Sequence, residues 1–314
     1  MNLNLVLQEL VVGIATGAIY ALIALGYTMV YGIIELINFA HGDIFMIGTF
    51  ASIAIFSLLG VTTASHPTGF SLVVILLITC LGSMLICAVL GIVIERIAYR
   101  PLRNAPRLAP LISAIGVSLI LEDVGKLWNG VTDVAFPRIF PSAVYYIGPV
   151  SINSVDIFVV VVAVILMVAL QWFVSNTSTG RAMRAVAQDR EAASLMGINV
   201  DRVISITFFI GAGLAGAAGL IYGLKYGSTI FSVGYQFGLI AFTAAVLGGI
   251  GNLVGAMLGG VLIGIIEAFT TLIQDPPLPG GGPAWTRAFI FGILILILVF
   301  RPSGLLGQHT PEKV

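Results

Sequence analysis

The sequence predicts an all-α polytopic membrane protein, from its composition, its long apolar blocks and its charge balance. Of its 314 residues, 59% are hydrophobic and 9% are charged, whereas soluble domains carry about a quarter charged residues. So few charges cannot cover a water-facing surface, and the lipid bilayer is therefore the main solvent of this chain. The formal net charge is zero, which argues against nucleic acid as a partner. We treat residues 1–314 as a single transmembrane domain.

The apolar blocks predict eight to ten membrane-spanning helices, with nine in our preferred assignment. Most of the blocks are long enough to cross ~30 Å of hydrocarbon as a helix, although 108–121 is short. Block 237–273 is too long for one span, and we divide it at the glycine-rich segment Gly248–Asn252. The blocks lie near residues 11–34, 44–60, 71–94, 108–121, 155–174, 203–222, 237–273 and 286–300.

Two polar segments, 95–107 and 175–202, contain eight of the 14 Lys and Arg residues. Basic loops accumulate on the cytoplasmic side of membrane proteins, and the two spans between these segments allow both to lie there. Four spans after 202 then return Arg301 to the cytoplasm, which supports the division of block 237–273. Residues 122–154 become an external loop, a partly ordered cap that could include a short interfacial helix. The eight basic residues are Arg96, Arg100, Arg103, Arg107, Arg181, Arg184, Arg190 and Arg202.

Segment 175–202 has the pattern of a folded loop built from two short helices. Thr177, Ser178 or Thr179 can cap a first helix that starts near Arg181. Asp189 can cap a second helix that begins at Arg190 and ends at Gly197, where a left-handed residue is wanted. Small residues would let this helix seat in a groove of a partner; a solvated connector is the alternative. The residues predicted to act in docking are Arg181, Arg184, Asp189, Arg190, Glu191, Ala192, Ala193 and Gly197.

A second polar interruption, Asn38–Asp43, separates the first two apolar blocks. Charged residues at membrane depth cost ~2.5–3.5 kcal/mol each, so they persist where they face protein or water. One interpretation is a structural bend in which Asn38 and Asp43 cap helix ends. The other is a discontinuous helix that lines a translocation path, with the Gly248–Asn252 break as its counterpart in an inverted repeat. The candidate path residues are Asn38, His41, Gly42, Asp43, Gly248, Gly249, Gly251 and Asn252.

Repeated small residues in the spans predict close helix packing, with a subunit interface as the alternative. Examples are the four-residue repeats Gly251, Gly255, Gly259 and Gly260, Gly264, and the series Gly211, Gly213, Gly216, Gly219. We expect Glu267, inside a span, to bond to a neighbouring helix rather than to line the path. Cys80 and Cys87 lie roughly 10 Å apart on a helix, which is too far for a disulfide.

The sequence lacks the patterns that chemistry would require. No G-x-x-x-x-G-K-[ST] motif occurs, so we expect this chain to bind no ATP by that route. No G-x-S-x-G motif and no His/Glu metal cluster occur. One His beside one Asp, at His41 and Asp43, does not make a metal site. We therefore predict no catalytic residues, no metal and no bound cofactor.

Several blocks resemble a known family. The residues E191-A-A-S-L-M-G197 fit the EAA-x3-G core of the coupling loop of ABC importer permeases, without the I-x-LP continuation. Nearly the whole chain resembles the high-affinity branched-chain amino acid permease, H-type subunit, although Ile240 stands where that family commonly has Lys. The blocks that carry this resemblance are 31–43, 95–107, 109–116, 197–203, 241–252 and 301–307.

The resemblance implies a permease subunit of a bacterial, binding-protein-dependent importer in the cytoplasmic membrane. It also implies Leu, Ile or Val as substrate and three kinds of partner: a homologous second permease subunit, two ABC ATPase subunits that hydrolyse the ATP, and an external substrate-binding protein. Two alternatives remain open. The same scaffold could import urea, amides or another small solute, or the chain could be an ion-coupled secondary transporter that uses Asp43 and Glu267.

Overall fold

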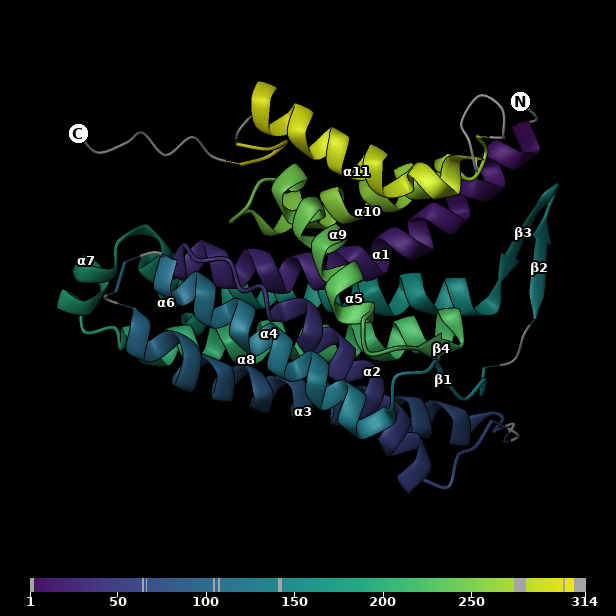
Figure 1. The fold of residues 1–314 in the computed structure, drawn as a ribbon, viewed down its shortest axis with the longest axis horizontal. Coiled ribbons are helices and arrows are strands. Elements are labelled where there is room, and N and C mark those ends of the chain that lie inside the picture. Colours follow the sequence, from purple (N-terminus) through teal and green to yellow (C-terminus); the bar gives the residue numbers. More distant parts are fainter. Residues whose placement is uncertain are drawn as a thin grey trace.

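The computed structural model describes residues 3–63, 65, 67–103, 105–106, 108–140, 143–273, 281–301 and 303–307. These residues form eleven α-helices, a π turn with a 3₁₀ turn, and four short strands (Figure 1). The helices are α1 (Leu3–Ile34), α2 (His41–Leu58), α3 (Phe70–Ile94), α4 (Leu108–Asn129), α5 (Ser154–Asn176), α6 (Ser178–Gln188), α7 (Arg190–Leu195), α8 (Val200–Tyr226), α9 (Val233–Gly248), α10 (Leu253–Thr270) and α11 (Gly281–Phe300). The turns are η1 (Glu95–Tyr99) and η2 (Arg100–Leu102), and the strands are β1 (Val134–Ala135), β2 (Val144–Ile147), β3 (Val150–Asn153) and β4 (Ser228–Thr229).

The predicted all-α polytopic class is confirmed. Eight helices among the described residues are long and apolar enough to cross a membrane, and α9 is a shorter apolar helix of 16 residues. The long block 237–273 does divide at the predicted place, because α9 ends at Gly248 and α10 begins at Leu253. Gly249 and Gly251 have positive φ values of 105° and 93°, which glycine adopts without a Cβ clash.

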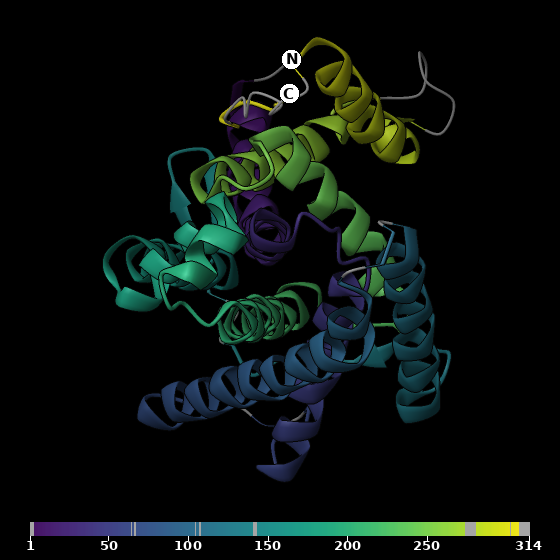
Figure 2. The same cartoon turned by 90° about the vertical axis from the view of Figure 1, so that its left-hand side faces the viewer.

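Helices α1 and α8 form the centre of the bundle. The most apolar part of each is 78% buried, whereas that of α11 is only 6% buried. Figure 2 shows the bundle from the end, with α8 inside and α11 at the periphery. The exposed faces of α3, α4, α5 and α11 are rich in Leu, Ile and Val. Lipid is a good solvent for such faces, so the outer helices need no further cover.

Glycines set the distance between the central helices. A Cβ on Gly17 of α1 would lie 2.6 Å from the Cα of Val261 in α10, and one on Gly219 of α8 would lie 2.6 Å from the amide of Thr49 in α2. Likewise, a Cβ on Gly216 would lie 2.5 Å from the carbonyl oxygen of Ser83. The packing interpretation is therefore confirmed for Gly216 and Gly219, whose contacts lie inside this chain.

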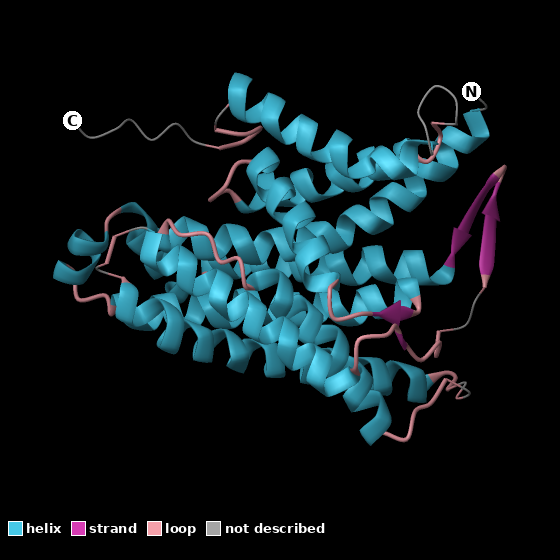
Figure 3. Ribbon diagram, viewed as in Figure 1, coloured by secondary structure: helices cyan, strands magenta, loops and turns pink. Residues whose placement is uncertain are grey.

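Residues 122–154 differ from the expected external loop. Helix α4 continues through Glu122 and Asp123 to Asn129, because Lys126 pairs with both acids along the helix surface, at 3.5 and 3.0 Å. No separate helix lies between α4 and α5 in the described residues; instead β2 and β3 form an antiparallel hairpin, and β1 pairs with β4 (Figure 3). The expected start at 122 and the option of an interfacial helix were wrong. The external position of the connection stays a prediction.

The two basic segments lie at one end of the bundle, and the β2–β3 hairpin lies at the other (Figure 1). Arg100 and Arg103 both pair with Asp201 at the start of α8, each at 2.5 Å. This contact agrees with the prediction that both segments share one side of a membrane. Arg107, the last residue of the basic segment 95–107, lies outside the described residues.

Candidate functional site

Helices α6 and α7 have the predicted caps. The Thr177 hydroxyl oxygen accepts a hydrogen bond from the Gly180 amide at 3.0 Å, so α6 begins at Ser178, three residues before the expected start. The Asp189 carboxylate accepts from the amides of Glu191 and Ala192, at 2.9 and 3.0 Å. The chain then leaves α7 through Gly197, whose φ is +82°. The loop is therefore folded, as two capped helices.

Two arginines that we predict to act in docking also form hydrogen bonds within this chain. The Arg184 guanidinium donates to the carbonyl of Val174, and that of Arg181 reaches the carbonyl of Asn176 at 3.5 Å. Both carbonyls lie in the last turn of α5, which has unsatisfied acceptors and the negative end of the helix dipole. These side chains therefore join α6 to the end of α5.

Arg190 makes the most consequential contact of the loop. Its Nη2 and Nε donate to the main-chain carbonyl of Ile33, at 2.8 and 3.2 Å. Ile33 lies in the last turn of α1, where the carbonyl would otherwise have no helical partner. A cationic group at this end of a helix is also favoured by the helix dipole. Arg190 thus ties α7 to the central helix of the bundle.

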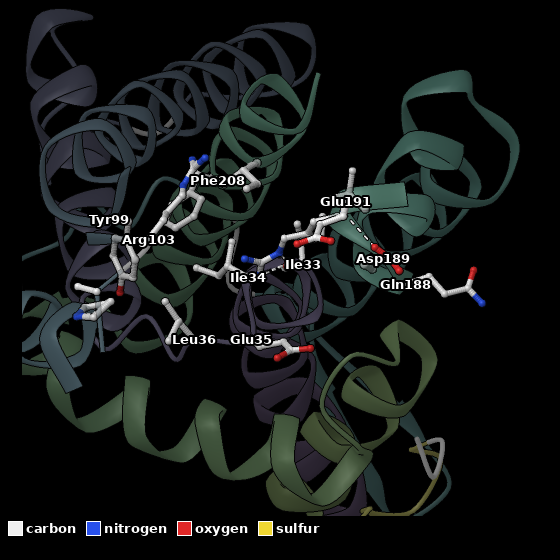
Figure 4. Close-up of a pocket in the computed structure, with 16 residues that line it drawn as sticks. Ile33, Ile34, Glu35, Leu36, Tyr99, Arg103, Gln188, Asp189, Glu191 and Phe208 are labelled. Atoms are coloured by element: carbon white, nitrogen blue, oxygen red, sulfur yellow. Dashed lines mark hydrogen bonds between the residues drawn. The ribbon is translucent and has the colours of Figure 1, made fainter. Parts of the chain in front are cut away.

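A cavity of about 410 Å³ lies where α7 meets α1, η1–η2 and α8 (Figure 4). Ile33, Ile34, Glu35 and Leu36 supply one wall, at the break between α1 and α2. The other walls come from Gln188, Asp189, Arg190 and Glu191 on the loop, Tyr99 and Arg103 on the turns, and Ile204 and Phe208 on α8. The structure therefore brings together the loop and the first break, which are far apart in the sequence.

The break between α1 and α2 is present, but the predicted caps are wrong. Ala40 holds the N-cap position of α2 and makes no side-chain cap. The Asn38 side-chain oxygen instead accepts from the Tyr99 hydroxyl at 3.1 Å. Asp43 lies inside the first turn of α2, and its Oδ2 accepts from the Ser118 hydroxyl of α4 at 2.5 Å. The side-chain oxygens of Asn38 and Asp43, which we expected to cap helix ends, therefore bind the hydroxyl groups of Tyr99 and Ser118, which are distant in the sequence.

His41 and Gly42, which follow the break, are closely packed and line none of the cavities described here. His41 is buried, and its ring lies edge-on to Tyr27 with centroids 4.8 Å apart. Gly42 meets α9, because a Cβ on Gly238 would lie 2.9 Å from the Cα of Gly42. The role of these residues in a path stays a prediction.

The second break, between α9 and α10, lies at the same end of the bundle as α6 and α7. Asn252 caps α10 by accepting from the Gly255 amide at 3.0 Å, and its Nδ2 donates to the Leu306 carbonyl at 2.8 Å. Gly248 and Gly249 contact the C-terminal segment 303–307 or α10. A small cavity of about 80 Å³ is bounded by Gly32, Gly251 and three α6 residues, Met183, Arg184 and Ala187. Helix α6 thus borders both breaks.

A polar network at this end was not foreseen. Glu95 is fully buried, pairs with Arg103 and accepts from the Ser205 hydroxyl at 2.8 Å. Arg103 also reaches Asp201 at 2.5 Å. The charges were visible in the sequence, but their pairing joins residues about a hundred positions apart.

Glu267 behaves as expected. Its Oε2 accepts from the Tyr20 hydroxyl of α1 at 2.6 Å, which is a bond between neighbouring helices. Within the described ranges, no group of three or more His, Cys, Asp and Glu side chains could hold a metal ion. Both cysteines are free thiols.

A bundle of membrane-length helices with a polar helical loop seated near two breaks, one between α1 and α2 and one between α9 and α10, is the arrangement expected of a membrane transport component. Residues 10–298 match the family described as the permease component of branched-chain amino acid transport systems. The chain belongs to this family, which is a family of transport components rather than of enzymes.

Two relatives cover almost the whole chain. The high-affinity branched-chain amino acid transport system permease protein BraD of Pseudomonas aeruginosa is 42% identical over 98% of each chain. LivH of Escherichia coli K12, which has the same description, is 42% identical over 98% of this chain and 97% of its own. The autoinducer 2 import system permease protein LsrC of Yersinia pseudotuberculosis is 30% identical over 44% of this chain. No solved structure matches the chain.

Proposed function

We propose that this chain is the membrane-spanning subunit of an ATP-driven importer of branched-chain amino acids in the cytoplasmic membrane. One observation carries the proposal: α6 and α7 form a capped, polar unit that Arg190 ties to the end of α1, at 2.8 Å from the Ile33 carbonyl. A loop with no mechanical role would need neither the two caps nor an anchor on the central helix. Its relatives BraD and LivH are named for transport of these substrates.

In this proposal α6 and α7 receive a movement and pass it to the spans. Gly180, Met183 and Val186 are buried beneath α6, and Ala193 is buried beneath α7, so the unit moves as a body with the helices it touches. Leu195 and Met196 are exposed by 88% and 83% and face away from the bundle. These two side chains offer a partner ATPase an apolar contact, while Glu191 and Ala192 flank it. A shift at this interface would change the packing at both breaks.

The partners proposed here are those that the family resemblance implies. The chain has no phosphate-binding loop motif, so two partner ABC ATPases would bind and hydrolyse the ATP, and this chain would hold no cofactor. A homologous second permease subunit would complete the path, and an external binding protein would deliver the substrate. The cargo is a zwitterion with an apolar side chain.

The test is reconstitution of the complete complex in proteoliposomes. We expect saturable, ATP-dependent uptake of leucine that requires the binding protein. Urea and acetamide, offered under the same conditions, should not accumulate. Uptake of the amides without leucine would assign a different cargo to this scaffold, and leucine uptake driven by an ion gradient without ATP would contradict the ATPase coupling.

A further inference from the structure

The end of the bundle opposite α6 and α7 contains the largest cavity described here, about 780 Å³. Its size falls within the ~300–1,000 Å³ typical of small-molecule sites. Residues from the start of α5, the end of α8 and the segment before β2 form most of its walls. The start of α5 and the end of α8 lie at the end of the bundle away from α6 and α7 (Figure 1). Nothing in the coupling role of α6 and α7 uses this cavity.

The cavity is lined by both positively and negatively charged side chains, as a zwitterionic ligand would require. Lys225 of α8 pairs with Oδ1 of Asp156 in α5 at 2.5 Å, and their side chains are only 11% and 19% exposed. Oδ2 of Asp156 accepts no hydrogen bond in the described part of the chain. Arg138 brings a second cation, so the lining carries one more positive than negative charge.

Arg138 is the charged residue of this cavity whose guanidinium is available to bind an anion. Its exposed guanidinium lies over Gly227, where a Cβ would be 3.1 Å from Nε, and it has no acidic partner among the described residues. Gly227 has a φ of +73° and ends α8 without a side chain, which leaves room for the guanidinium. Planar guanidinium groups bind carboxylates through two parallel hydrogen bonds.

Apart from Asn153 and Gly227, the remaining lining is apolar or aromatic. Val12, Phe140, Val155 and Leu224 surround the charged groups, with Tyr226 beside them. The Tyr226 ring packs against the rings of Tyr222 and Phe237, with its centroid 4.6 and 5.9 Å from theirs. The aliphatic side chain of an amino acid could contact this apolar surface, next to charged groups that could bind its ammonium and carboxylate groups.

We propose that this cavity is a receiving site for the zwitterionic, apolar amino acid on the side where the substrate enters. Arg138 binds the α-carboxylate, Oδ2 of Asp156 accepts from the α-ammonium group, and Phe140 and Leu224 contact the aliphatic side chain. Lys225 holds Asp156 in place. This inference rests on the proposed function, since the substrate class comes from there.

The test is leucine binding to the complex in nanodiscs without the binding protein, measured by equilibrium dialysis of radiolabelled leucine. Wild type should bind leucine saturably, and leucinol, which lacks the carboxylate, should compete at least tenfold more weakly. Arg138→Gln should weaken binding by about tenfold or more, the effect of losing a charge-assisted bond. Arg138 is exposed, so this variant should fold, and Arg138→Lys should lose less.

Lys126→Gln is the matched control, because Lys126 is a cation at the same end that lies outside the cavity and pairs with Glu122 and Asp123. It should bind leucine as wild type does. Equal losses in both variants would indicate a general charge effect and overturn the site, as would wild-type affinity in Arg138→Gln or equal competition by leucinol. If the wild-type complex transports leucine yet binds none without the binding protein, the site is wrong while the proposed function stands. If it transports no leucine at all, the proposed function fails first.

Discussion

The guanidinium of Arg190 donates two hydrogen bonds to the carbonyl oxygen of Ile33, with Nη2–O and Nε–O distances of 2.8 and 3.2 Å. This contact joins residues 157 positions apart. It fixes the second helix of a polar loop to the end of α1, one of the two most buried spans. A force applied to α7 can therefore reach α1, and the break that follows it, through this bond.

The end of α7 depends on the backbone of Gly197. Its φ of +82° is unfavourable for residues with a Cβ, and a Cβ there would meet no atom within 4 Å. The effect of Gly197→Ala is therefore conformational, and we expect a destabilisation of about 1–2 kcal/mol. A lower thermal midpoint and weaker co-purification of the ATPase would show it.

Gly197→Asn is the control for this prediction, because Asn tolerates the left-handed conformation better than Ala. It should keep more of the stability and more of the ATPase contact. Equal behaviour of the Ala and Asn variants would show that backbone conformation at Gly197 does not limit the docking of α7.

The hydroxyl of Tyr20 holds Glu267 in the bundle through a bond of 2.6 Å. Tyr20→Phe removes this donor and leaves a partly buried carboxyl group with a lost partner, which costs about 1–3 kcal/mol. We expect a lower thermal midpoint in detergent and an unchanged leucine concentration for half-maximal uptake. A shifted half-maximal concentration at unchanged stability would instead assign Glu267 to the path.

Close contact between α1 and α10 requires glycine at position 17. A Cβ there would lie 2.6 Å from the Cα of Val261 and 2.9 Å from the carbonyl oxygen of Gly260. These neighbours are backbone atoms and cannot rotate away, so we expect Gly17→Ala to destabilise the bundle by about 1–3 kcal/mol. Thermal unfolding would measure the change.

Gly292→Ala in α11 is the matched control, because a Cβ there meets nothing within 4 Å. It should leave the thermal midpoint unchanged or raise it slightly, since Ala favours helix. A similar loss in both variants would mean that close packing at Gly17 is not the cause.

Much of the fold could be predicted because its causes are local. Long apolar runs are enough to place spans in lipid, and the glycines around Gly249 interrupt a run that is too long for one helix. The caps at Thr177 and Asp189 and the left-handed Gly197 depend on residues within three positions, so they too were visible in the sequence.

The site depends on longer-range contacts and was predicted less well. The polar residues from Glu122 onward resemble a loop in the sequence. Helix α4 continues through them because Lys126 pairs with Glu122 on the helix surface. Asn38 could have capped a helix, but Tyr99 takes its oxygen from 61 residues away. Arg190 was predicted to act in docking, which stays a prediction, and its bond to the Ile33 carbonyl at the end of α1 was not foreseen. No spacing rule identifies partners of this kind.

The most direct test of the account is Arg190→Gln in the reconstituted complex, compared with Arg202→Gln. Arg202 is an exposed cation of the same segment, and its side chain makes no hydrogen bond or ion pair in the described structure. The measurement is leucine taken up per ATP hydrolysed. Hydrogen bonds from a charged group contribute ~1.5–3 kcal/mol, and 1.4 kcal/mol is about a factor of ten. We predict a roughly tenfold lower ratio for Arg190→Gln with normal assembly, and a wild-type ratio for Arg202→Gln. A wild-type ratio in Arg190→Gln would contradict the coupling of α7 to α1.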